Sequence, residues 1–236
     1  MFDTAQATPE LAQTLKQPHD QLLGSIARGD ELGSAEALRA GADPNATCAE
    51  GSVIHAAALS TYASLTVLRQ LRAMGADLTA TDSSGSNALA IIPRSGAPTP
   101  RRIARALYFI RHGAALDAPN HRGMQPLHHA ARYRDAALVT LYLVNGANAN
   151  VKDHQQRTPL HWLLEFSTVY DQEVRRCVEQ LVAAGANLAE CTGEWPTPEE
   201  LLHRSIKEPT WFAKLEDLGK RLPLHRWLAK HPDFEI

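Results

Sequence analysis

Apolar residues between positions 120 and 150 recur at intervals of three and four, which is the spacing of one face of an α-helix. The first such stretch starts at Pro126 and places Leu127, Ala130 and Ala131 on one side. Proline fits the first turn of a helix, because the N–H that it lacks would be unpaired there and its φ is already helical. The pattern therefore predicts a short first helix whose packing face is built mainly of small residues.

A second helix is predicted from about Asp135 to Val144, where Leu138, Leu141 and Tyr142 share one face. Gly146 is expected to end this helix, because glycine adopts the left-handed C-cap conformation without a Cβ clash. With a turn at positions 120–123 in front of it, the stretch reads as one helix–turn–helix unit.

A Gly-Ala pair like the one that closes this unit also closes four other stretches of the chain. The glycines are Gly41, Gly75, Gly113, Gly146 and Gly185, at intervals of 34, 38, 33 and 39 residues. Such regular spacing predicts an array of similar units, and the two longer intervals predict an insertion in two of them.

Two hexapeptides connect these units to a known family. Residues 125–130 read Q-P-L-H-H-A and residues 158–163 read T-P-L-H-W-L. Both resemble the T-P-L-H-x-A signature of the ankyrin repeat, which has a period of about 33 residues. The resemblance covers roughly residues 19 to 202. It implies an all-α fold, an ankyrin-repeat solenoid of stacked helix-turn-helix units with short hairpin turns and a helical C-terminal cap.

The resemblance also divides the chain into an N-terminal extension (1–18), an array of about five to six units (19–202) and C-terminal capping helices (203–236). The insertion near 94–100 is expected between the two helices of its unit. The segment 167–173 is either a similar insertion or an extension of the second helix. An end repeat needs a polar outer face, and Trp195, Trp211 and Trp227 are expected to fill the core beneath it.

Composition narrows the choice of partners and location. The formal net charge is −2 and the pI about 6.6, so no overall basic field draws the chain to nucleic acid or to a membrane. No secretory signal and no stretch of roughly 18 apolar residues is visible, so a cytoplasmic location is expected. The cysteines at 48, 177 and 191 lack a C-x-x-C pattern and are interpreted as reduced thiols.

The eleven histidines raise the question of an enzyme or a metal site. His55, His128 and His161 stand at the signature histidine, which in the family bonds to backbone and ties a helix to the adjacent turn. His128 and His129 diverge by roughly 100° on a helix, which disfavours joint ligation of a metal. Motifs for metal or phosphate binding are absent from the sequence. We therefore expect no catalytic residue, no metal and no cofactor.

The family's variable positions, at the turn tips and on the concave side of the inner helices, predict the binding surface. They correspond here to His121, Arg122, Met124, Arg132, Tyr133, His154, Gln155, Arg157, Glu165 and Phe166. Arginine and tyrosine are frequent in interface hot spots. Three arginines against one glutamate predict an acidic patch on the partner. Trp162 lies on an inner helix and either fills the core or reaches the groove.

The resemblance implies a non-catalytic scaffold, monomeric when free, that binds a partner protein through its concave surface. A narrower hypothesis is a bacterial inhibitor or immunity-type protein that masks an enzyme. The alternative is an ankyrin effector delivered into another cell, with residues 1–18 as the delivery signal. An enzyme would instead require a deep pocket where the C-terminal helices meet the last repeat.

Overall fold

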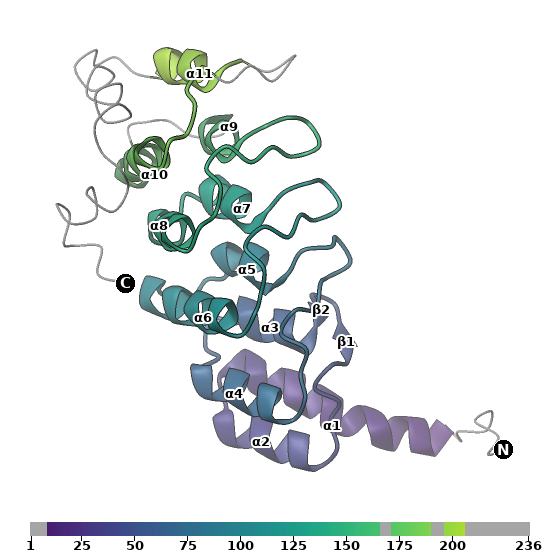
Figure 1. Cartoon of the computed structure of the whole chain (residues 1–236). Helices are drawn as coiled ribbons and strands as arrows, with labels where there is room; N and C mark the ends of the chain where they lie inside the picture. Colours follow the sequence, from purple (N-terminus) through teal and green to yellow (C-terminus); the bar gives the residue numbers. More distant parts are fainter. Residues whose placement is uncertain (1–8, 166–170, 190–195, 206–236) are drawn as a thin grey trace.

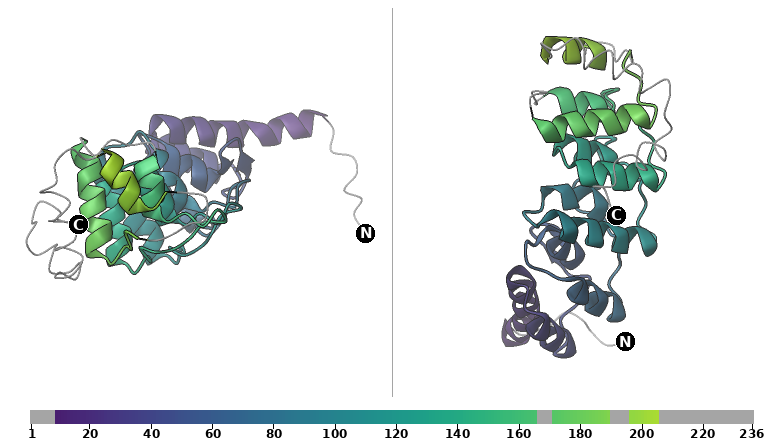
Figure 2. Two further views of the ribbon diagram at one scale, coloured as in Figure 1. Left: turned by 90° about the horizontal axis from the view of Figure 1, so that it is seen from above. Right: turned by 90° about the vertical axis from the view of Figure 1, so that its left-hand side faces the viewer.

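The computed structural model describes residues 9–165, 171–189 and 196–205, and the structural statements below concern these ranges. The described chain is mostly helical, and its helices follow one another in pairs along the molecule, from α1 and α2 at one end to α11 at the other (Figure 1). The side view in Figure 2 shows the same order of stacked pairs. The three tryptophans at 195, 211 and 227, Cys191 and the expected capping helices beyond residue 205 lie outside the described residues.

The first pair consists of α1 (Pro9–Arg28) and α2 (Glu31–Arg39). Helix α1 is continuous over 20 residues and includes Pro18, so the expected boundary between residues 18 and 19 falls inside a helix. From residue 9 onward the N-terminal extension therefore shares its helix with the first unit. The side chain of Asp30 caps α2 by accepting a hydrogen bond from the Gly33 N–H at 2.9 Å.

Shorter helices form the middle layer of the view in Figure 1, between the turns and a second row of helices, and we call them the inner helices. They are α3 (Val53–Leu59), α5 (Ala88–Ile91) with its 3₁₀ continuation η1 (Ile92–Arg94), α7 (Pro126–Arg132) and α9 (Pro159–Glu165). Helix α11 (Pro198–Ser205) continues beyond α9 and starts where the W-P-T-P segment predicted another inner helix.

The outer helices complete the pairs on the side away from the turns. They are α2, α4 (Leu65–Ala73), α6 (Thr99–Arg111), α8 (Ala136–Val144) and α10 (Gln172–Ala183). The chain between η1 and α6 carries the insertion, which thus lies between the two helices of its unit as predicted. In the fifth unit, α10 includes only the last two residues of the segment 167–173.

Turns connect each outer helix to the next inner helix. The turn in front of α3 is a small hairpin, in which β1 (Thr47–Cys48) pairs antiparallel with β2 (Gly51–Ser52). In the unit formed by residues 120–150, Asp135 caps α8 through a 3.1 Å bond from the Leu138 N–H, and Gly146 has a φ of 95°. The predicted start of α7 at Pro126 and the predicted end of α8 at Val144 are confirmed, and Asp135 is the N-cap of α8.

The core runs continuously through the stack, because successive helix pairs bury their apolar faces against one another. Leu127 on α7 and Leu141 on α8 are both fully buried. The Tyr142 hydroxyl donates to the Leu89 carbonyl at 2.8 Å, which ties α8 to the inner helix of the preceding unit. Each unit therefore depends on its neighbours for a closed core.

A buried arginine stabilises the loop between α3 and α4. Arg105 on α6 is 1% exposed and donates to the carbonyl of Ala58 at 3.1 Å, of Ser60 at 2.6 Å and of Ala63. Burial lowers the pKa of this guanidinium to about 10, so it remains charged at neutral pH. The three carbonyl oxygens compensate the charge in place of a carboxylate.

Removal of core volume tests the stacking. We expect Leu127→Ala and Leu141→Ala each to lower the free energy of unfolding by about 2–5 kcal/mol, because each leaves a cavity in a closed core. Urea denaturation followed by circular dichroism measures the effect. Leu32→Ala is the matched control, since Leu32 is 78% exposed and its truncation should cost less than about 0.5 kcal/mol. A loss below about 1 kcal/mol for both core variants would show that the packing faces are misassigned.

Candidate functional site

Equivalent positions of the inner helices lie in rows, because α3, α5, α7 and α9 pack one against the next. Counted from the signature position, the last residue of each inner segment forms one row, which we call the end row. Three residues earlier in each helix lies a second row, which we call the middle row. The end row contains Leu59, Arg94, Arg132 and Glu165. The middle row contains Ala56, Ile91, His129 and Trp162.

Trp162, in the middle row, is held by the turn that precedes its helix. Its indole Nε1 donates to Asp153 Oδ2 at 2.9 Å, and the residue is only 3% exposed. One unit earlier the same two positions hold His129 and Asn120, with 3.4 Å between Nε2 and Nδ2. A turn residue thus fixes the middle-row side chain in both units, and Trp162 is buried among its neighbours.

Three arginines surround this indole ring. The guanidinium carbon of Arg157 lies 3.7 Å from the ring centroid, and those of Arg132 and Arg122 lie at 5.1 and 5.4 Å. These distances are within the range of cation–π attraction. We call Arg122, Arg132, Arg157, Trp162 and Asp153 the Trp162 cluster.

The arginines of the Trp162 cluster differ in whether a carboxylate neutralises their charge. Arg157 is 3% exposed and forms ion pairs with Asp153 at 3.3 Å and with Glu165 at 3.0 Å. Arg122 and Arg132 are exposed, and within the described residues neither forms an ion pair. The surface of the cluster is therefore positively charged, while its interior is neutralised.

Two of the residues predicted for the binding surface are buried. Met124 is 1% and Arg157 is 3% exposed. Their backbone N–H groups donate to the side-chain oxygens of Asn120 and Asp153 at 3.0 and 2.9 Å. These bonds fold the turn back over both residues, so neither side chain is exposed at the surface to which the sequence assigned it.

The other predicted positions divide between two places. His121, Arg122, His154 and Gln155 are exposed at the turns, where the His154 N–H donates to the Arg122 carbonyl at 3.0 Å and links successive turns. Glu165 is half-buried and paired with Arg157, and Phe166 lies outside the described residues.

One surface arginine was missed by the sequence analysis. Arg94 is exposed at the end of η1, one unit before Arg132 in the end row. The charges of Arg132 and Arg94 both lower the pKa of His129, although burial is the larger cause. The insertion after α5 changes the distance from Arg94 to the closing glycine of its unit, so units aligned on that glycine do not pair Arg94 with Arg132. Units aligned on the inner helix do pair these two residues.

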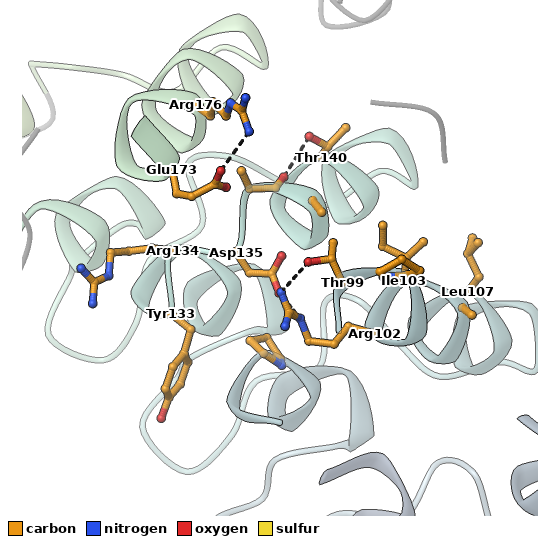
Figure 3. A pocket seen from close by; sticks show the side chains of 15 residues that line it. Thr99, Arg102, Ile103, Leu107, Tyr133, Arg134, Asp135, Thr140, Glu173 and Arg176 are labelled. Atoms are coloured by element: carbon orange, nitrogen blue, oxygen red, sulfur yellow. Dashed lines mark hydrogen bonds and ion pairs between the residues drawn. The ribbon is translucent and has the colours of Figure 1, made fainter. Parts of the chain in front are cut away.

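A hollow of about 810 Å³ lies away from this face, between α6, α8 and the start of α10 (Figure 3). Tyr133, in the loop after α7, is one of its lining residues. The hollow's acidic groups are already bound, since Asp135 pairs with Arg102 at 2.6 Å and Glu173 with Arg176 at 2.9 Å. Its lining residues include neither histidine nor cysteine.

Comparison with known families identifies one of the units. Residues 122–154 match the family model described as Ankyrin repeat. The chain contains an ankyrin repeat. The match begins at a turn tip, spans α7 and α8 and ends at the next turn tip, so it corresponds to one complete unit. Among the curated proteins, none matches this chain.

Within the ankyrin repeat, the signature histidine has the expected structural role. His128 Nδ1 accepts from the Gln125 N–H at 3.0 Å, and its Nε2 lies 3.1 Å from the Arg157 carbonyl. The ring therefore connects α7 to the turn of the next unit, and His55 connects in the same way to the carbonyl of Ser86.

In the part of the chain that the structure describes, no group of three or more His, Cys, Asp or Glu residues is placed to hold a metal ion. Nor does any described helix have both the length and the apolar composition needed to cross a bilayer.

Burial of the ankyrin-repeat histidines predicts a loss of stability in mild acid. Desolvation lowers the pKa of both His128 and His129 to about 4, whereas an unfolded histidine has a pKa near 6.5. The unfolded chain thus binds these protons more tightly, so the stability is fully present above about pH 6.5 and is lost as the pH falls toward 4. We expect a decrease of about 2 kcal/mol for each imidazole between pH 7 and pH 5.

Urea denaturation at a series of pH values measures this decrease. His129→Gln removes one of the two titrating groups and should reduce the pH-dependent loss by about half. If the variant and the parent lose the same free energy of unfolding over this range, His129 does not titrate as inferred.

Proposed function

We propose that the chain is a non-catalytic scaffold that binds an acidic surface of a partner protein. The partner would lie on the face formed by the inner helices and the turns, which we call the inner-helix face. The observation that carries the proposal is the pair of exposed guanidiniums, Arg122 and Arg132, beside a buried indole and without a carboxylate partner among the described residues. Two guanidiniums that converge on one ring present several N–H donors side by side, and a carboxylate of a partner can accept hydrogen bonds from them.

The Trp162 cluster suits binding because it is ordered before a partner arrives. Asp153 and Arg157 hold the Trp162 ring in place, so the exposed arginines contact a ring whose position is already fixed. A preorganised surface loses less conformational entropy on association. Tryptophan and arginine are also the residue types most enriched in interface hot spots.

The exposed positions around the Trp162 cluster extend the proposed surface. They are His121, Arg122, Arg132, His154 and Gln155, together with Tyr133, which lines the hollow of about 810 Å³ and whose ring centroid lies 5.9 Å from the Arg132 guanidinium carbon. We propose that the whole array is an ankyrin-repeat solenoid that acts in the cytoplasm and is monomeric until it meets its partner. The net charge of −2 favours neither nucleic acid nor a membrane as that partner.

A narrower form of the proposal is a bacterial inhibitor or immunity-type protein, which would place the cationic face over an acidic region of an enzyme. The alternative is an ankyrin effector that binds a host protein after delivery into another cell. Secretion measured with and without residues 1–18 separates the two, since only the effector requires export. If the chain inhibits the enzymatic activity of the captured partner, the result supports the inhibitor hypothesis.

Charge reversal on the face tests the proposed function. A partner captured from the native lysate is identified by mass spectrometry, and its affinity is then measured with purified proteins. We expect Arg122→Glu combined with Arg132→Glu to lower the affinity by at least about 2 kcal/mol, roughly thirtyfold. The matched control reverses two exposed arginines of the outer helices, Arg72→Glu with Arg111→Glu.

The control pair should leave the affinity within threefold of the parent. An affinity within threefold for the Arg122/Arg132 variant, with its circular dichroism spectrum unchanged, would show that the partner binds elsewhere. Equal losses in both double variants would indicate a long-range charge effect without a defined surface.

A further inference from the structure

The inner-helix face is apolar at the N-terminal end of the stack and positively charged further along it. Between α1 and α3, at its N-terminal end, lies an open hollow of about 440 Å³. Leu23, Ala27, Ala56 and Leu59 line it, with Tyr62 at its edge and 61% exposed. This end of the face thus offers apolar surface, and the hollow's lining includes no arginine or lysine.

The end row leads from this hollow to the free charges. Leu59 lines the hollow, and the next two members of the row are Arg94 and Arg132. Both arginines are exposed, and in the described ranges neither forms an ion pair. The fourth member, Glu165, is already bound by Arg157, so the free cationic stretch ends there.

The spacing of the layers sets the spacing of a matching ligand. Packed helices lie about 8–10 Å apart, so successive members of the end row are separated by roughly that distance. A polyproline II segment rises about 3.1 Å per residue and returns to the same side every third residue. Side chains three positions apart on such a segment therefore advance by about 9 Å, which is one layer of the stack.

We propose that this face binds an extended acidic segment of the partner protein, with one apolar side chain in the α1–α3 hollow and two carboxylates, about three positions apart, on Arg94 and Arg132. The apolar residue precedes or follows the nearer carboxylate by about three to five positions, which spans roughly one to one and a half layers. This inference rests on the proposed function and specifies which feature of the partner is recognised.

The chemistry of the hollow favours a protein segment over a nucleic acid. A nucleic acid would meet both arginines with phosphates, but it has no aliphatic side chain for an apolar hollow. Glu50 also lines the hollow and would repel a phosphate placed there. A peptide avoids this repulsion, because the residue that enters the hollow is uncharged.

Synthetic peptides test the inference with the full chain. Twelve-residue fluorescent peptides with a Ser/Pro background carry one Leu and two Glu, and the spacings between them are varied in both chain directions. Fluorescence polarisation measures each affinity. Peptides with the two Glu three positions apart, and the Leu three to five positions from the nearer one, should bind at least tenfold tighter than peptides of identical composition with other spacings.

Variants of the chain then assign the contacts. Arg94→Glu and Arg132→Glu should each weaken the best peptide at least tenfold, and Ala27→Trp, which fills the hollow from an exposed position, should weaken it only when the peptide contains the Leu. Arg72→Glu on the outer helix α4 is the control and should leave the affinity within twofold.

Three results would overturn the inference. They are equal binding of all spacings, no binding of any peptide at 1 mM, and tighter binding of a twelve-nucleotide single-stranded DNA than of the best peptide. If Arg122→Glu with Arg132→Glu still abolishes capture of the native partner, the proposed function survives and only the extended segment is wrong. If capture also persists in that double variant, both proposals fail.

Discussion

Packing of each unit against the next is the constraint on which the rest of the structure depends. The signature histidine bonds to the turn of the following unit, and Tyr142 of one unit bonds to a carbonyl of the preceding one. These bonds fix the register of the stack. Positions about one period apart in the sequence consequently become neighbours in space, so a row of side chains on the face is determined by residues far apart along the chain.

The register explains why charge accumulates on one face of a chain with a slightly negative total. Arg94 and Arg132 belong to the same row, and the turn tip of the fourth unit adds Arg122. The acidic groups nearby are engaged by the fold itself. Asp153 accepts from Trp162 and from Arg157, and Glu165 pairs with Arg157. Hydrogen bonds from the Arg157 backbone and Trp162, with the Arg157 charge, more than offset burial and keep the pKa of Asp153 lowered. Among the described residues, Arg94, Arg122 and Arg132 therefore remain exposed without an ion pair.

Much of the fold could be predicted from the sequence, because it depends on local patterns. Proline at the start of α7, the three-and-four spacing in α8 and the closing glycine are each read within one turn of helix. The direction of a side chain at a turn cannot be read in this way from neighbouring residues. The sequence assigned Met124 and Arg157 to the binding surface, but bonds from their own backbone to turn side chains direct both inward. The environment of Trp162 likewise depends on arginines contributed by the preceding unit.

The central claim, that the partner lies on the inner-helix face, is tested most directly by hydrogen–deuterium exchange of the chain with and without its captured partner. The account predicts slower exchange at the turns around residues 121–123 and 154–156 and along the inner helices α7 and α9, with α6 and α8 unchanged. Protection confined to α6, α8 and the start of α10, around the hollow of about 810 Å³, would contradict it.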